Sequence, residues 1–169
     1  MDLYNGLLTR RSVRKYAKRH VENELITKVL KAAMYAPSSN NTQPWHFLVS
    51  RDKDIFKKFI DVHPYAKMLL EADCGVLVLR NRNLQYNEGY GTTDCSAATQ
   101  NLLLAAHSLG LGTCWIGTYP RENRIEFLRK AYKLPDHLEP FAVVSLGWPE
   151  RESVQPDRFD ESRIIWAGE

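Results

Sequence analysis

Residues 94–117 have the sequence DCSAATQNLLLAAHSLGLGTCWIG, which predicts a long helix over 94–109 followed directly by a strand over 113–117. The centre of the helix, residues 102–106, is apolar on nearly every side, as expected for a helix buried in a core or a subunit interface. One of the polar residues at 92–94 can cap its start. Gly110 can end it in the left-handed conformation.

Further helices and strands alternate along the rest of the chain. Hydrophobic periodicity, prolines and glycines predict helices over 2–9, 22–36, 52–61, 65–72 and 121–132, and strands over 45–50, 75–79 and 140–146. Residues 81–93, rich in Asn, Gly and Tyr, predict a loop. We expect one domain over residues 1–148.

The last segment, residues 149–169, differs from the rest because it has little apolar periodicity. A long irregular tail on a compact domain is usually disordered or wrapped around a partner subunit. Ile164, Ile165 and Trp166 would be costly to leave in water. We therefore expect the tail to be an extended arm that wraps a second subunit.

Composition sets the broad class of protein. The chain has 169 residues, of which 44% are hydrophobic and 25% charged, as in an ordinary globular domain. No apolar run is long enough to span a membrane, and the N-terminal residues lack the pattern of a secretory signal. The three cysteines have no CxxC spacing, which argues against a disulfide framework or a zinc site. We expect a cytoplasmic protein with no membrane partner.

Positive charge is concentrated near the N-terminus. The net charge is +3, yet residues 10–19 contain six bases and no acids, so the remainder carries −3. This distribution favours a focused anion site over a broad nucleic-acid surface. The alternatives are a solvated basic loop and a nucleic-acid-binding module, although few aromatic residues lie among the bases and no recognition helix is evident. We expect no nucleic-acid partner.

The glycines at 110–117 do not form a dinucleotide-binding motif. Trp115 occupies the place of the third glycine of GxGxxG, and the segment follows a helix and opens a strand, which is the reverse of the required order. We interpret Gly117 instead as a glycine that lets a ligand lie on the backbone.

Candidate nucleophiles are weak. Cys95 lies at the start of the predicted helix, where a thiolate could be stabilised, but we favour a small buried residue. Cys74 and Cys114 fall in apolar strands, and the five histidines show no metal-ligand spacing. Chemistry is therefore expected from a bound cofactor, with no catalytic side chain and no metal.

The segment between Pro37 and Pro44 is a polar loop of serine, asparagine, threonine and glutamine. Its amide and hydroxyl groups suit the edge of a heteroaromatic ligand. An ordinary turn between a helix and a strand is the alternative.

Together these segments resemble the nitroreductase family of FMN-dependent oxidoreductases. The resemblance rests on the order of three motifs: Arg-Arg-Ser-Val-Arg at 10–14, Ala-Pro-Ser-Ser-Asn-Asn-Thr-Gln-Pro-Trp at 36–45, and an Ala-rich helix ending in Gly-Leu-Gly-Thr-Cys-Trp-Ile-Gly at 110–117. It implies an α+β fold, a three-layer α/β/α sandwich with a mostly antiparallel central sheet. It also implies a homodimer with FMN at the interface.

The resemblance assigns cofactor contacts to particular residues. Arg10, Ser12 and Arg14 would hold the FMN phosphate, ribityl chain and pyrimidine edge, with Arg11 contributing through its backbone and Arg158 as the arm's phosphate contact. The other subunit would contribute the loop residues Pro37, Ser38, Ser39 and Asn41. Ile116 and Gly117 would offer backbone N–H groups to flavin N5, and Lys67 would lie near N1 and O2.

The same resemblance implies an activity. NADH or NADPH would reduce FMN, and a small-molecule acceptor such as a nitroaromatic or a quinone would then take the hydride in a ping-pong cycle. Positive charge from Arg14 and Lys67 would stabilise the reduced cofactor. The short segment 81–93, where longer members carry inserted helices, suggests an open site. It leaves a specialised flavin-handling member with weak reductase activity as the alternative.

Overall fold

A four-stranded sheet forms the centre of the computed structural model, which describes residues 2–151 and 154–168. The strand order is β1-β2-β4-β3, and each neighbouring pair is antiparallel. The strands are β1 (Trp45–Ser50), β2 (Cys74–Asn81), β3 (Gly112–Gly117) and β4 (Leu138–Gly147). Strand β3 is therefore an edge strand, which leaves one row of its backbone groups outside the sheet.

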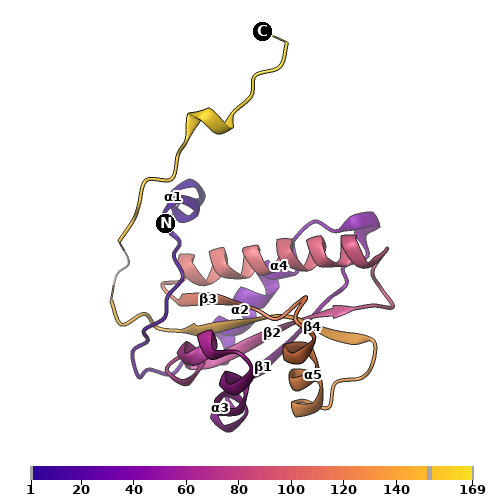
Figure 1. Ribbon diagram of the computed structural model, residues 1–169. Helices are drawn as coiled ribbons and strands as arrows, with labels where there is room; N and C mark the ends of the chain where they lie inside the picture. The colour runs from indigo at the N-terminus through magenta and orange to yellow at the C-terminus, as the bar shows by residue number, and fades with distance from the viewer. Residues whose placement is uncertain (1, 152–153, 169) are drawn as a thin grey trace.

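Helices cover both faces of this sheet (Figure 1). One face carries α2 (Asn23–Ala33) and α4 (Glu88–Ser108), and the other carries α3 (Lys53–Val62), the 3-10 helix η2 (Pro64–Leu70) and α5 (Glu122–Ala131). Helix α1 (Leu3–Thr9) lies apart from these layers and contacts α4. The α+β fold and the three-layer arrangement expected from the sequence are confirmed.

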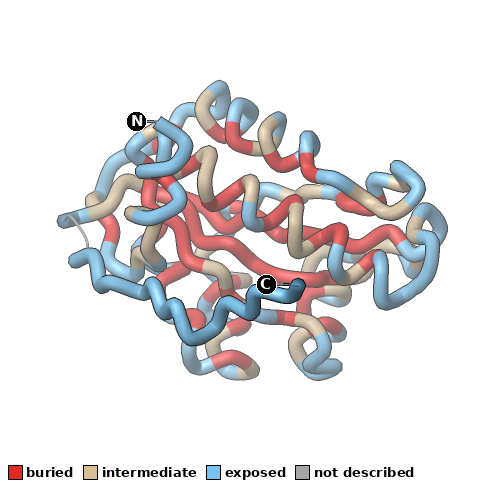
Figure 2. Tube along the Cα trace, turned by 90° about the horizontal axis from the view of Figure 1, so that it is seen from above, coloured by how far each residue is buried: buried red, intermediate tan, exposed pale blue. Residues whose placement is uncertain are grey.

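The sheet separates two apolar cores. Val76, Val78 and Val144 pack with α2 and α4, whereas Leu77 packs with Phe59 on the opposite face. Every residue of β2 is buried, which explains why residues 74–79 are continuously apolar instead of alternating; Arg80 and Asn81, at the end of the strand, are buried polar residues. Figure 2 shows this buried centre as red strands enclosed by more exposed helices.

Helix α4 begins earlier than the sequence predicts. It starts at Glu88 instead of residue 94, and the Asn87 side chain accepts a hydrogen bond from the Tyr90 N–H at 3.0 Å. The predicted caps at 92–94 are wrong, as is the loop over 88–93. Two glycines hid this turn, because glycine disfavours helix. Position 91 favours glycine despite this propensity, because a Cβ there would collide with the Gln85 side chain.

Other boundaries differ by a few residues. The helix predicted over 22–36 ends at Ala33, and the one predicted over 65–72 is the 3-10 helix η2, with Pro64 in its first turn. Strand β2 extends to Asn81 where 79 was predicted. Gly110 adopts the expected left-handed conformation, with φ of 78°, directly after α4.

The tail leaves the body of the protein after β4 (Figure 1). It contains only one short 3-10 helix, η3 (Glu161–Arg163), among its described residues. Large apolar side chains along it lie in solvent, including Val154 at 90% exposure and Trp166 at 70%. Exposure of this size is unfavourable, so the geometry agrees with an arm that needs a partner surface.

The revised start of α4 makes a stability prediction. Asn87→Ala removes the capping bond and is expected to lower the free energy of unfolding by about 1 kcal/mol. Thr93→Ala, at a residue formerly expected to cap, should change it by no more than about 0.5 kcal/mol. Urea unfolding followed by circular dichroism measures both. Equal losses in the two variants would contradict the observed start.

Candidate functional site

The basic segment runs alongside the free edge of β3. Ser12 forms a parallel bridge with Thr113, and the Val13 N–H donates to the Thr113 carbonyl oxygen at 2.8 Å. This contact occupies the outer edge of β3 only at the start of the strand. The far end, at Ile116 and Gly117, is left open by the segment.

Alternate side chains of an extended segment point in opposite directions. Val13 packs against Gly112, where its methyl carbons leave no room for a Cβ. Arg10, Ser12 and Arg14 instead lie near Cys114. Burial raises the pKa of the Cys114 thiol. The charge of Arg14, a hydrogen bond with Ser12 and the charge of Arg10 each act to lower this pKa. The structure thus gathers these three predicted residues on one side.

Arg10 is also close to the tail. Burial lowers the pKa of Arg10, and the neighbouring charges of Arg158 and Arg11 lower it further. The positive charges of Arg10, Arg11 and Arg158 thus lie near one another, and such a cluster is electrostatically suited to an anion such as a phosphate. Arg158 is thus one of the positive charges near Arg10, and its role as the arm's phosphate contact stays a prediction.

The Arg11 side chain has a different role. Its Nη1 donates to the carbonyl oxygens of Leu8 at 2.8 Å and Arg10 at 2.7 Å, and its Nε donates to that of Val154 at 3.3 Å. The guanidinium thus ties the end of α1 to the tail. The Arg11 side chain is therefore engaged within the chain, and a contact of its backbone with a ligand stays a prediction.

The open end of β3 presents the Gly117 peptide. The Thr113 carbonyl points away from β4, to the outer edge of the sheet. Because the N–H and C=O groups of successive strand residues point to opposite sides, those of Gly117 also point outward, whereas those of Ile116 point towards β4. Accordingly, the Gly117 carbonyl accepts a hydrogen bond from Arg124 Nη1 at 2.8 Å. No atom lies within 4 Å of a Cβ built on Gly117. A planar ligand can therefore lie against this backbone.

The polar loop is fixed by its own hydrogen bonds. Ser38 Oγ accepts from the Gln43 N–H at 3.0 Å, and the Ser39 N–H donates to Asp94 Oδ1 at 3.0 Å. Asn41 has a positive φ of 55° and accepts from Gln43 Nε2 at 2.9 Å. Pro37 and Asn41 are exposed. The loop is thus a preformed polar surface attached to α4.

Within one chain, the two halves of the predicted site do not meet. The polar loop is held at Asp94, in the first part of α4, whereas Thr9 Oγ1 contacts His107 Nε2 at 2.8 Å at the other end. Asp94 and His107 are 13 positions apart, which spans roughly 20 Å along a helix. Figure 1 shows α1 and the polar loop at opposite ends of α4.

Lys67 lies on η2 and is exposed. This helix shares its sheet face with α3 and α5, the helix that carries Arg124. In the part of the chain that the structure describes, no hydrogen bond or ion pair joins Lys67 to residues 10–14, so its place near the cofactor stays a prediction.

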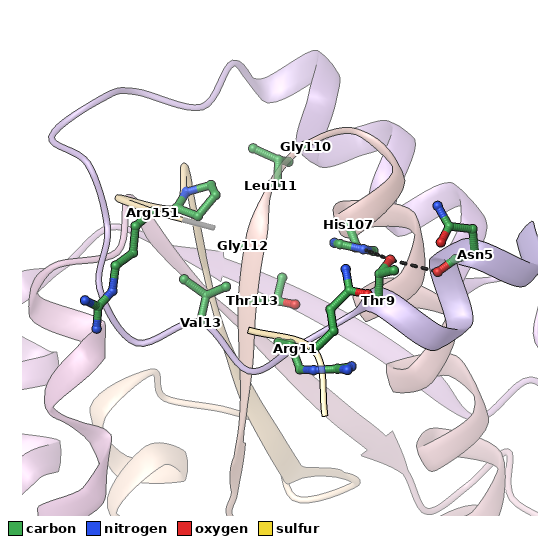
Figure 3. Close-up of a pocket in the computed structure, with 12 residues that line it drawn as sticks. Asn5, Thr9, Arg11, Val13, His107, Gly110, Leu111, Gly112, Thr113 and Arg151 are labelled. Atoms are coloured by element: carbon green, nitrogen blue, oxygen red, sulfur yellow. Dashed lines mark hydrogen bonds between the residues drawn. The ribbon is translucent and has the colours of Figure 1, made fainter. Parts of the chain in front are cut away.

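A cavity of about 390 Å³ lies on the other side of the basic segment. It is enclosed by α1, the end of α4, the start of β3 and the tail, and Arg11, His107 and Arg151 line it (Figure 3). Arg11 is the one predicted site residue among those that line it. This cavity is therefore distinct from the open edge at Gly117.

The structure adds two residues that the sequence did not single out as site residues. Asp94 was expected only to cap a helix, but its buried carboxylate holds the polar loop. Arg124 lies in an ordinary charged helix, and its contact with Gly117 depends on how α5 packs against the sheet. Neither role leaves a local sequence signal.

Acid–base and thiol chemistry have little support. Cys74, Cys95 and Cys114 are all buried, and burial raises the pKa of Cys74 and of Cys95 to about 12. Across the described ranges 2–151 and 154–168, no group of three or more His, Cys, Asp or Glu side chains could hold a metal ion. In the same ranges, no helix is long and apolar enough to cross a membrane.

Comparison with known proteins identifies the family. The family model described as "Nitroreductase family" matches residues 7–63 and 60–148, and the chain belongs to this family of oxidoreductases. A relative from Methanothermobacter thermautotrophicus is 45% identical over 97% of this chain and 86% of its own. That relative is provisionally named an NADH dehydrogenase/NAD(P)H nitroreductase.

Solved structures agree with this assignment. A crystal structure from Parabacteroides distasonis with the same provisional name has a TM-score of 0.93 at 38% identity, covering 98% of each chain. A nitroreductase from Desulfovibrio desulfuricans, solved in complex with FMN, has a TM-score of 0.88 at 31% identity and covers 98% of this chain and 96% of its own.

The thiol environment predicts inertness. At pH 8, a thiol with a pKa of about 12, as for Cys95, has about one part in ten thousand as thiolate. We expect Ellman's reagent to react with the folded protein at least about 100-fold more slowly than with protein in guanidinium chloride. Rapid reaction of one thiol in the folded protein would contradict the buried assignment.

Proposed function

We propose that the protein is an FMN-dependent oxidoreductase that passes hydride from NADH or NADPH to a nitroaromatic, a quinone or a similar small acceptor. The observation that carries this proposal is the arrangement along the free edge of β3. Arg10, Ser12 and Arg14 gather at its start, and the open peptide of Gly117 lies at its end.

The residues present fit the cofactor. The uncompensated charges of Arg10 and Arg158 suit the phosphate, and Ser12 and Arg14 lie on the same side of the segment for the ribityl chain and the pyrimidine edge. From Thr113 to Gly117 the strand spans roughly 13 Å, which gives an elongated ligand a continuous edge to follow. Bound FMN would supply the hydride-accepting atom, N5, so the chain needs no nucleophile of its own.

Each residue then has a physical task. The outward N–H of Gly117 orients the reactive edge of the cofactor, and Lys67 and Arg14 supply positive charge where the reduced cofactor is anionic. The absent Cβ of Gly117 leaves space for donor and acceptor to approach in turn, as a ping-pong cycle requires. Tyr86, in the short segment before α4, and Tyr90, in the first turn of α4, are both exposed, which fits an open site.

A homodimer completes the proposal. The separation of the basic segment and the polar loop along α4 favours a cleft in which Pro37, Ser38, Ser39 and Asn41 come from the second subunit. The exposed apolar side chains of α1 and the tail supply a surface for that subunit. We place the protein in the cytoplasm, where its buried thiols stay reduced.

The direct test is the visible spectrum of purified protein loaded with FMN, recorded anaerobically before and after NADH and then NADPH. We expect the flavin bands to bleach with at least one donor and to return when a quinone is added. Bands that persist with both donors would favour the flavin-handling alternative. Protein that binds no FMN would contradict both proposals.

The phosphate assignment predicts the effect of one substitution. Arg10→Ala removes a charged hydrogen bond of about 1.5–3 kcal/mol, so FMN should bind roughly 10- to 150-fold more weakly. Lys18→Ala, which removes the same charge from the same basic segment outside the predicted contacts, is the control. Fluorescence titration with FMN measures both, and equal affinities in the two variants would refute the assignment.

The shared cleft predicts a complementation pattern. We consider a dimer with Arg10→Ala in one chain and Asn41→Ala in the other, isolated with two different affinity tags. If each cleft takes Arg10 from one chain and Asn41 from the other, both defects fall in one cleft, and about half of the sites stay intact. That dimer should bind about half as much FMN tightly as the unmodified dimer.

The matched control carries both substitutions in one chain and none in the other. Under the shared arrangement each of its clefts contains one defect, so no site is intact. If both residues served a cleft within their own chain, the control dimer would keep about half of its FMN sites and the dimer with one substitution in each chain would keep none. That result would overturn the proposal.

A further inference from the structure

We infer that Arg124 gives this site a preference for acceptors that carry a carboxylate or another anionic group. The inference rests on the proposed function, because it assigns a substrate class to the same site. The feature behind it is the position of a positively charged side chain beside the open peptide of Gly117.

The guanidinium of Arg124 is anchored by one contact and otherwise free. Arg124 lies in the first turn of α5, and its Nη1 donates to the Gly117 carbonyl oxygen at 2.8 Å. In the part of the chain that the structure describes, its other N–H groups have no hydrogen-bond partner, and no carboxylate lies within ion-pair distance. A fixed guanidinium with unused donors is suited to binding a carboxylate.

The surroundings leave this positive charge uncompensated. On α5 itself, Glu126 is engaged with Lys130 at 3.6 Å. The neighbour on the α3 side is His63, which is 5% exposed and packs edge-on against Phe59. Burial lowers the pKa of His63, and the charge of Arg124 lowers it further, so both effects disfavour a charged ring there.

An acceptor can reach this charge and the cofactor together. Gly117 is exposed, and no atom lies within 4 Å of its missing side chain. A ring placed against Gly117 would have Arg124 at its rim. The hydrogen bond to the Gly117 carbonyl fixes the distance between the charge and the peptide that faces the cofactor.

The experiment compares 4-nitrobenzoate with 4-nitrobenzyl alcohol, which have similar size and differ in charge. The measured quantity is the ratio of their kcat/KM values with FMN-loaded protein at low salt. We expect Arg124→Gln to lower this ratio roughly three- to fivefold, the effect of a partly exposed ion pair. Its kcat/KM for the alcohol should fall much less than that for 4-nitrobenzoate, and Arg124→Lys should keep most of the preference.

Arg121→Gln is the matched control, because Arg121 is exposed on the same helix and its side chain makes no capping bond. The kcat/KM ratio of this control should equal that of the unmodified protein. In the unmodified protein, the preference for 4-nitrobenzoate should weaken as salt is added. An unchanged ratio in Arg124→Gln, or an equal loss for both acceptors, would overturn the inference. Either result leaves the proposed function intact, which fails separately if neither acceptor reoxidises the cofactor.

Discussion

The hydrogen bond from the Val13 N–H to the Thr113 carbonyl is the constraint on which the site depends. It holds an extended basic segment against the free edge of β3, and this fixes which side chains point to which side. Arg10, Ser12 and Arg14 then share a side with Cys114, while Arg11 and Val13 turn towards α1, the tail and Gly112. Without this pairing, the arginines would be an unordered surface cluster.

The length of α4 sets the second constraint. Its first part holds the polar loop through Asp94, and its end packs against α1 through His107. A rigid helix between these points keeps the two halves of the proposed cofactor site apart within one chain. The fold therefore favours a cleft built from two chains, and the exposed apolar residues of α1 and the tail fit the same requirement.

Much of the fold follows from local sequence. The strand over 45–50 has its predicted bounds, and Gly110 ends α4 as expected, because side-chain pattern and backbone freedom act locally there. The predicted start of α4 is wrong because the sequence pattern weights the low helix propensity of Gly89 and Gly91 above the capping side chain of Asn87. The boundaries of the two parts of the chain, 1–148 and 149–169, stay a prediction.

The site was predictable to the extent that it lies in continuous motifs. The family resemblance named the basic segment, the polar loop and Gly117, and the structure shows which of these one chain brings together. Arg124 could not be found this way, since its contact with Gly117 joins α5 to the end of β3 through tertiary packing. The cofactor contacts themselves remain proposals.

A crystal structure of the protein grown with FMN tests the central claim most directly. The account predicts the phosphate among Arg10, Ser12 and Arg158, the ribityl chain along the outer edge of β3, and flavin N5 at the Gly117 N–H. A phosphate bound instead in the cavity lined by Arg11 and Arg151, with the edge at Gly117 free of flavin, would contradict it.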